Sequence, residues 1–166
     1  MAAHDPSRRS LFVGRASAEP ALRPPWALDE AAFLDTCTGC NACVQRCPEQ
    51  VLATASGGYP VFDPRLGECT FCGTCADACQ ARALDRSAGQ APWSYRAQVA
   101  ASCLTQQGVV CASCRDACPE HAIAFRPAVP VASPAIDADR CSGCAACVGA
   151  CPASAISIRP HCLEAA

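Results

Sequence analysis

The sequence predicts an α+β protein made of two tandem modules, each with an internal pseudo-twofold repeat. Two observations lead to this prediction. The spacing C-x2-C-x2-C-x3-C recurs along the chain, and short apolar or alternating segments lie between its copies. The intervals then pair the first copy with the second and the third with the fourth. Cys47 to Cys79 and Cys118 to Cys151 are nearly equal in length, whereas Cys79 to Cys118 is longer.

The last copy, over residues 141–152, reads C-x2-C-x2-C-x3-C-P. This is the run of bacterial-type [4Fe-4S] ferredoxins, in which three thiolates bind one cluster and the fourth binds a second cluster. Gly143 favours a close approach of the loop backbone, because glycine adopts φ > 0 without a Cβ penalty. Pro152 ends the loop, because it lacks an N–H and fixes φ. The predicted fold is therefore two tandem bacterial 2[4Fe-4S] ferredoxin-like modules.

Four [4Fe-4S] clusters account for sixteen of the seventeen cysteines and leave Cys162 over. The third run has only Cys111, Cys114 and Cys118 at the regular spacing, and we expect Cys103 to supply its missing ligand across an insertion. The alternative is that Cys103 is a buried apolar cysteine. The expected ligands are Cys37, Cys40, Cys43 and Cys79 for site one; Cys69, Cys72, Cys75 and Cys47 for site two; Cys103, Cys111, Cys114 and Cys151 for site three; and Cys141, Cys144, Cys147 and Cys118 for site four.

Two other uses of so many cysteines fit the sequence less well. A disulfide scaffold is typical of short secreted chains, but the odd cysteine count and the regular order of the runs argue against it. Four-cysteine zinc sites usually need two separated C-x2-C pairs. Each run here places three thiols close together, which suits a cubane better.

Composition excludes several other classes of protein. The formal net charge is −2, with thirteen Arg and no Lys, so no basic face for nucleic acid is expected. No window approaches the ~18 apolar residues of a membrane span, so we expect a soluble protein without direct membrane insertion. Rossmann, P-loop and acid–base motifs are absent, and we expect no enzyme. Aromatic residues make up only 5% of the chain, so the clusters should replace missing side-chain core.

The expected order along the chain is a flexible N-terminal arm over residues 1–28, module one over 29–84, a connector over 85–98, module two over 99–160 and a tail over 161–166. A helix is predicted over 29–35, with Asp29 as its N-cap. A hairpin is predicted around Ser56-Gly57-Gly58, and short strands over 122–125, 135–137 and 155–158.

The N-terminal arm begins with features of an export signal. Arg8-Arg9 followed by Leu-Phe is similar to a twin-arginine motif, but Gly14 and Arg15 interrupt the roughly 7 to 15 apolar residues that a signal needs. We therefore expect a non-cleaved cytoplasmic arm. Arg8, Arg9 and Trp26 are candidate partner-binding residues, because Arg and aromatic side chains dominate interfaces. The alternative is a disordered tail.

These features together resemble one family, the NapF ferredoxin-type proteins of the periplasmic nitrate reductase system. The resemblance spans nearly the whole chain, with one departure at Gln80, which follows Cys79 where three other runs have Pro. It is carried by Ser7-Arg8-Arg9, Gly14-Arg15, Arg23-Pro24-Pro25-Trp26, Asp29-Glu30, Phe33, Cys37-Thr38, Gly57-Gly58-Tyr59-Pro60 and the displaced Cys103 with Cys111-x2-Cys114.

The resemblance implies a cytoplasmic four-cluster protein. Such a protein binds the precursor of the catalytic molybdenum nitrate reductase and assists its maturation before export, by helping to load its Fe–S cluster. The alternative is an electron-transfer polyferredoxin that relays electrons to a redox partner, because several clusters in one small body make a short relay.

Overall fold

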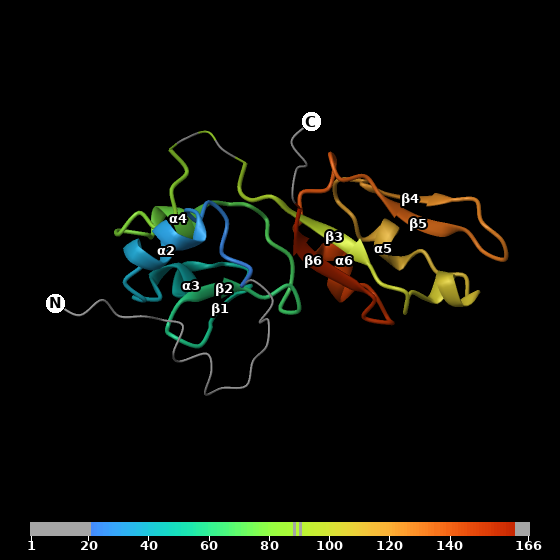
Figure 1. Ribbon diagram of the computed structural model, residues 1–166, viewed down its shortest axis with the longest axis horizontal. Helices are drawn as coiled ribbons and strands as arrows, with labels where there is room; N and C mark the ends of the chain where they lie inside the picture. Colours follow the sequence, from blue (N-terminus) through green and yellow to red (C-terminus); the bar gives the residue numbers. More distant parts are fainter. Residues whose placement is uncertain (1–20, 88, 90, 162–166) are drawn as a thin grey trace.

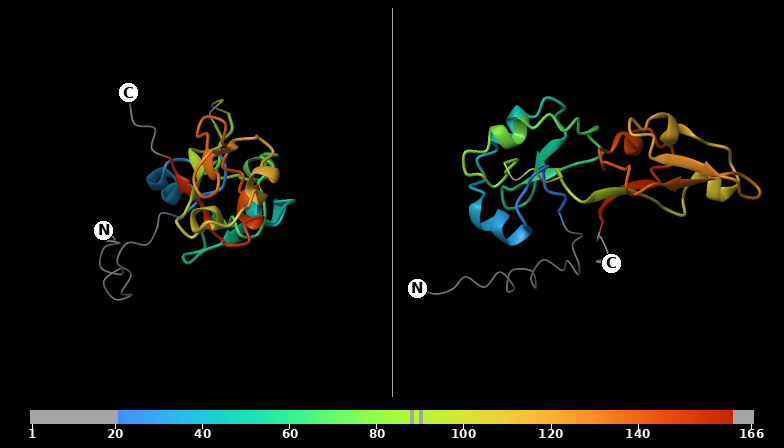
Figure 2. Two further views of the ribbon diagram at one scale, coloured as in Figure 1. Left: turned by 90° about the vertical axis from the view of Figure 1, so that its right-hand side faces the viewer. Right: turned by 90° about the horizontal axis from the view of Figure 1, so that it is seen from above.

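The computed structural model describes residues 21–87, 89 and 91–161, which form two lobes lying end to end along the long axis (Figure 1). The view from above shows the same separation (Figure 2). One lobe holds module one and the other holds module two, so the two tandem units of the sequence are also two units in space. Within the described part of the chain, no helix has the length and apolar character needed to cross a membrane.

Module one consists of short elements around a small core. They are α2 (Glu30–Thr36), α3 (Ala42–Arg46), β1 (Leu52–Thr54), β2 (Pro60–Phe62) and α4 (Thr74–Asp77). Helix α2 begins as predicted, because the Asp29 carboxylate accepts a hydrogen bond from the Ala32 N–H at 3.1 Å. The helix buries Phe33 completely.

The predicted hairpin of module one is confirmed. Strands β1 and β2 are antiparallel, and Leu52 lies opposite Phe62. Both side chains are buried, whereas the turn places Gly57 and Gly58 at φ +92° and +84°. Such dihedrals are readily accessible only to glycine, which is why this pair marks the turn.

Module two contains β3 (Tyr95–Val99), the 3-10 turn η1 (Leu104–Gln107), α5 (Ser113–Asp116), β4 (Ile123–Arg126), β5 (Ser133–Ile136), α6 (Ala146–Gly149) and β6 (Ile156–Pro160). The three predicted strand regions are present as β4, β5 and β6. The sequence did not predict β3, which pairs antiparallel with β6 and sets Tyr95 opposite Pro160. The last residues of the expected connector therefore belong to the sheet of module two.

The described parts of the two modules follow one topological order. Each has an inner hairpin, β1–β2 or β4–β5, and an outer antiparallel pairing between its beginning and its end. In module two the outer pairing is β3–β6, whereas in module one it is a single bridge between Ala27 and Leu84. In each module the two short helices that carry cysteines, α3 with α4 or α5 with α6, contact each other.

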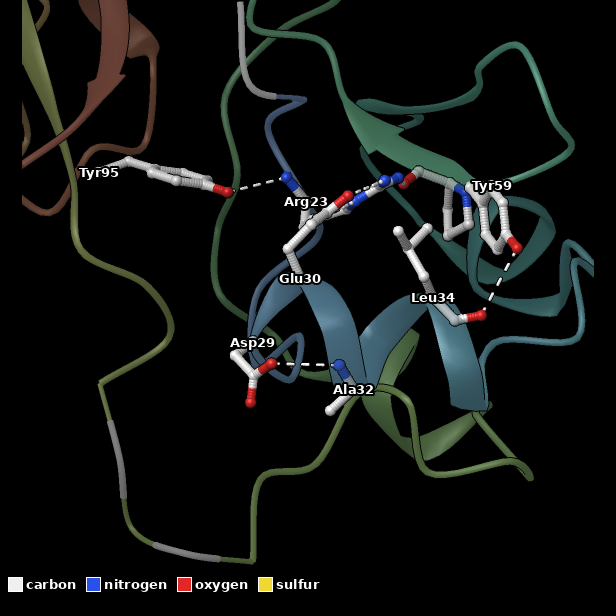
Figure 3. Close-up of polar contacts among 8 residues, drawn as sticks. Arg23, Asp29, Glu30, Ala32, Leu34, Tyr59 and Tyr95 are labelled. Atoms are coloured by element: carbon white, nitrogen blue, oxygen red, sulfur yellow. Dashed lines mark hydrogen bonds and ion pairs between the residues drawn. The ribbon is translucent and has the colours of Figure 1, made fainter. Parts of the chain in front are cut away.

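Residues 21–28, at the end of the expected arm, pack against both modules (Figure 3). The Arg23 guanidinium donates to both carboxylate oxygens of Glu30, at 2.9 and 2.6 Å. Its central carbon, Cζ, lies 4.6 Å from the centroid of the Phe33 ring. The Arg23 backbone N–H donates to the Tyr95 hydroxyl at 2.8 Å. Because Tyr95 opens β3, this segment joins module one to module two.

Candidate metal centres

Three of the four expected cysteine sets each line one cavity. The sets of site one, site two and site four are all complete, including the cysteine that comes from the neighbouring run. The remaining walls are mostly apolar or backbone, with Phe33 and Leu84 at site one, Val51 and Leu52 at site two, and Ile123 and Ile158 at site four. Segments far apart in the sequence therefore converge as the spacing predicts.

The third cysteine of each run is the buried one. Cys43, Cys75, Cys114 and Cys147 lie in α3, α4, α5 and α6 respectively, where the helix packs against its neighbour. In three runs the residue before the helix adopts a left-handed conformation, with φ +60° at Asn41, +84° at Gly73 and +75° at Ala145. This bend turns the loop back so that the third thiol faces inward, toward the other cysteines of its set.

The fourth cysteine of each run opens the same tight turn. Its carbonyl accepts a hydrogen bond from the N–H three residues later, at 3.2, 3.1, 3.1 and 3.1 Å for Cys47, Cys79, Cys118 and Cys151. The donor residues all have positive φ; they are Gln50, Arg82, His121 and Ser154. Gln80 therefore replaces proline after Cys79 without changing the turn.

Burial and local donors give the thiols of one site different acidities. Burial raises the pKa of Cys43 to about 11 and that of Cys75 to about 12. Cys40 and Cys72 are exposed, and hydrogen bonds lower their pKa values, chiefly from the Ala42 N–H to Cys40 and from the Thr74 hydroxyl to Cys72. Because iron binds the thiolate, the buried thiol must release its proton when a cluster is bound.

The donor sets fit [4Fe-4S] clusters better than the alternatives. All sixteen cysteines in the described residues are free, so none of them forms a disulfide. Within the same residues, no group of three or more Cys, His, Asp or Glu side chains surrounds a point where a single metal ion would bind. A zinc site needs four ligands about 2.0–2.3 Å from one ion. Thiols spread around an apolar cavity suit a polynuclear cluster, which has four thiolate ligands.

Site three is formed around the insertion in its run. Burial raises the pKa of the Cys114 thiol, and the nearby thiols of Cys103 and Cys111 raise it further. The insertion begins with η1, which is capped at its C-terminal end by Gly108, whose φ is +83°. The buried Thr105 places its hydroxyl 3.3 Å from the Cys103 sulfur. Cys103 is thus positioned beside the regular cysteines of its run, as expected of a ligand.

Cys151, the fourth cysteine expected at site three, is half-buried. Its sulfur accepts a hydrogen bond from the Ala155 N–H at 3.3 Å, and the Cys118 sulfur accepts one from the Ala122 N–H at the same distance. The two cysteines thus occupy equivalent places in their runs. The assignment of Cys151 to site three stays a prediction from the spacing.

The candidate partner-binding residues are only partly described. Arg8 and Arg9 lie outside the described residues, as does Cys162. Trp26 is half-buried, lines the cavity of site two and donates its backbone N–H to the Pro92 carbonyl at 2.6 Å. The Arg86 guanidinium lies 4.9 Å from the centroid of its ring. Trp26 therefore contributes to the wall of a cysteine cavity.

Comparisons with known proteins agree with this arrangement. Residues 36–84 and 109–155 each match a family described as a 4Fe-4S dicluster domain. The chain is 39% identical to the "Ferredoxin-type protein NapF" of Escherichia coli (strain K12), over 84% of this chain and 85% of that protein. It is also 39% identical to the "Ferredoxin-type protein NapF" of Haemophilus influenzae, over 82% of this chain and 74% of that protein.

A shorter similarity, 45% identity over 51 residues, links the chain to the "Methylamine utilization ferredoxin-type protein MauM" of Paracoccus denitrificans; it covers 27% of this chain and 23% of that protein. The cysteine runs are thus shared more widely, whereas the NapF similarity extends over most of the chain. The chain therefore belongs to the NapF ferredoxin-type proteins and contains two tandem 4Fe-4S dicluster domains.

Proposed function

We propose that this protein binds four [4Fe-4S] clusters through sixteen cysteines and, in the cytoplasm, assists maturation of the precursor of the periplasmic nitrate reductase catalytic subunit before export. The observation that supports the cluster content is the convergence of cysteines from different runs on common cavities. The maturation role is supported by membership of the NapF family, since the family resemblance implies that role.

The protein's own residues hold and shield the clusters. A bound cluster supplies iron, sulfide and one-electron redox chemistry. At sites one, two and four, the buried cysteines and apolar walls exclude water from one side. Cys40 and Cys72 are exposed and lie on the solvent side of sites one and two. These exposed thiolates make sites one and two accessible to a partner. We propose no independent catalytic cycle.

Electron transfer to a redox partner is the second candidate function. The observation that favours it is the direct contact between the loop of site two and the loop of site four, where the Cys69 N–H donates to the Cys144 carbonyl at 2.8 Å. This contact makes the two modules neighbours through their metal sites. A relay requires such proximity, whereas cluster delivery to a partner does not.

Cluster content is tested by anaerobic reconstitution. The protein should hold about sixteen iron atoms, because sixteen cysteines can bind four cubanes and each cubane contains four iron atoms. Its spectrum should show charge-transfer absorbance, and the reduced protein should show an EPR signal. A protein that takes up zinc and shows neither signal would overturn the cluster assignment.

The maturation role is tested by comparing capture of the two forms of the enzyme. We expect the intact protein to retain the cytoplasmic apo-precursor more strongly than the mature holoenzyme. Removing residues 1–20 should weaken this capture and leave the iron content unchanged. This deletion keeps Arg23, which binds Glu30, and the buried Pro24 and Pro25.

A matched pair of variants tests whether the arm's arginines carry the recognition. The double variant Arg8→Ala/Arg9→Ala should weaken capture. Arg65→Ala removes an exposed arginine whose ion-pair partner, within the described part of the chain, is Asp63. It should not weaken capture. Equal retention of apo-precursor and holoenzyme, together with rapid electron transfer that sustains nitrate reduction, would favour the carrier function instead.

A further inference from the structure

The two modules meet where the loops of site two and site four touch. Cys69, the first cysteine of the second run, donates its N–H to the carbonyl of Cys144, the second cysteine of the fourth run, at 2.8 Å. The two residues belong to different modules and to different cysteine sets. One hydrogen bond therefore connects two metal-binding loops directly.

Trp93 connects the same two loops through its side chain. Its indole N–H donates to the Ser142 carbonyl at 2.8 Å, within the loop of site four. Its ring packs edge-on against Phe71, with the centroids 5.2 Å apart, and Phe71 lies between the first two cysteines of site two. The ring also contacts Phe62, with the centroids 4.8 Å apart. We call Cys69, Phe71, Trp93 and residues 142–144 the seam.

The seam has no room for an added side chain at Gly143. A Cβ there would collide with the Tyr95 carbonyl oxygen and would lie 3.0 Å from the Trp93 indole nitrogen. Gly143 also has φ +76°, which glycine adopts without strain. The sequence indicated only that this glycine lets the backbone approach a cluster, whereas the structure shows that it also lets β3 approach the loop.

The loops of the other two sites pack within their own modules. In the loop of site one, a Cβ on Gly39 would lie 3.3 Å from the carbonyl oxygen of Gly58, in the turn of the same module. In module two, the turn η1, which follows Cys103, contacts β5. Sites two and four are thus the inner pair of the molecule, and sites one and three are the outer sites.

We propose that the seam couples sites two and four, so that occupancy of either site stabilises the loop of the other across the module boundary. The order of sites along the molecule is then one, two, four, three. This inference rests on the proposed cluster content and not on the maturation role. It assigns to Trp93 and Gly143 a positioning role that no cysteine motif predicts.

The physical basis of the coupling is a shared hydrogen-bonded contact. A filled site four fixes residues 141–147 and holds the Cys144 carbonyl against the Cys69 N–H. If that loop loosens, a polar group at the interface loses its partner, which costs free energy. Coupling between two binding sites is reciprocal, so site two must stabilise the loop of site four by the same factor.

The first experiment changes the seam and leaves the cysteines in place. Hydrogen exchange by mass spectrometry on the anaerobically reconstituted protein would monitor residues 69–75, in module one. We expect Gly143→Ala to raise exchange there by about fivefold or more, the effect of losing one hydrogen bond. The matched control is Gly149→Ala, in the same run, where a Cβ would meet no atom within 4 Å. It should leave exchange in residues 69–75 unchanged.

Trp93→Phe provides a second seam variant, which lies outside every cysteine run. It removes the donor to Ser142 and keeps an aromatic ring, and it should also raise exchange in residues 69–75 while iron content stays near the wild-type value. If both Gly143→Ala and Trp93→Phe leave this exchange at the level of Gly149→Ala, the proposed coupling is wrong.

The second experiment removes one site at a time. Cys147→Ser, which impairs site four, should raise exchange in residues 69–75 more than Cys114→Ser, which impairs site three in the same module. Conversely, Cys75→Ser should raise exchange in residues 141–147 more than Cys43→Ser. Equal effects of the paired variants would overturn the coupling. The iron counts of the same samples report separately on cluster content.

Discussion

Module one and module two place the same cysteine spacing on different supports. In module one, Phe33 is fully buried beneath the Arg23 guanidinium, and Tyr59 packs at 6.2 Å from its ring. Module two has instead a five-residue strand pair, β3–β6, at the position where module one has the single bridge from Ala27 to Leu84. The cysteine geometry is therefore compatible with either aromatic packing or strand pairing around it.

The modules also differ at the beginning of their first run. Cys37 directly follows α2, whose last backbone hydrogen bond runs from the Cys37 N–H to the Phe33 carbonyl. Cys103 precedes η1 and is separated from Cys111 by an insertion that exposes Val109 and Val110, by 51% and 83%. The comparison shows that a short turn can accommodate a cysteine that is displaced in sequence from the rest of its run.

The largest effect should come from removing iron from both modules. Anaerobic chelation should abolish most of the far-UV circular dichroism of the native protein, because the clusters replace side-chain core. Hydrogen exchange should show more residual protection around Phe33 and Tyr59 than anywhere in module two. Equal protection of the holo and apo forms in both modules would contradict the structural role given to the clusters.

A smaller effect should come from removing the displaced cysteine. Cys103→Ser should reduce the iron content from about sixteen to about twelve to fifteen atoms, by loss of one cluster or its conversion to a three-iron form. Cys162→Ser is the matched control and should retain the full content. Iron analysis and EPR of the oxidised protein would distinguish them, and the opposite result would assign Cys162 to site three.

The smallest effect should come from packing alone. Phe33→Ala should destabilise the protein by about 3–5 kcal/mol, the usual cost of removing a buried Phe. Phe125→Ala should cost less, because Phe125 is only half-buried. Anaerobic unfolding rates in denaturant would give the ranking. Leu34→Ala, at a side chain that is 39% exposed, serves as the control. If Phe125→Ala destabilised the protein more than Phe33→Ala, the conclusion that module one depends more on aromatic packing would be wrong.

The local features of the fold and most cysteine sets were predictable from the sequence. The Asp29 cap and the Gly57-Gly58 turn depend on neighbouring residues, so their signals are local. The sets of sites one, two and four follow from a fixed spacing that leaves one geometry for a four-thiolate site. Cys103 is a candidate ligand because its run lacks one cysteine at the regular spacing, and this assignment stays a prediction.

The contacts between distant segments could not be predicted in the same way. Strand β3 alternates weakly in polarity, and its pairing with β6 joins residues about sixty positions apart. Trp26 was predicted to bind a partner because the sequence does not show that Pro92 lies beside it. The contact between Arg23 and Tyr95 is equally invisible in the sequence. Trp93 fell in the expected connector, and nothing nearby in the sequence indicates that its partner is the Ser142 carbonyl.

The position of Trp93 has a consequence for protein engineering. A module one fragment ending at residue 87 would expose the faces of Phe62 and Phe71 that now contact this ring. A module two fragment beginning at residue 93 would carry an indole with no aromatic partner from the other half. Exposed apolar patches of this kind promote aggregation. Neither module is therefore expected to be readily exchanged for another dicluster domain. A chimera would need a complementary apolar surface for this tryptophan.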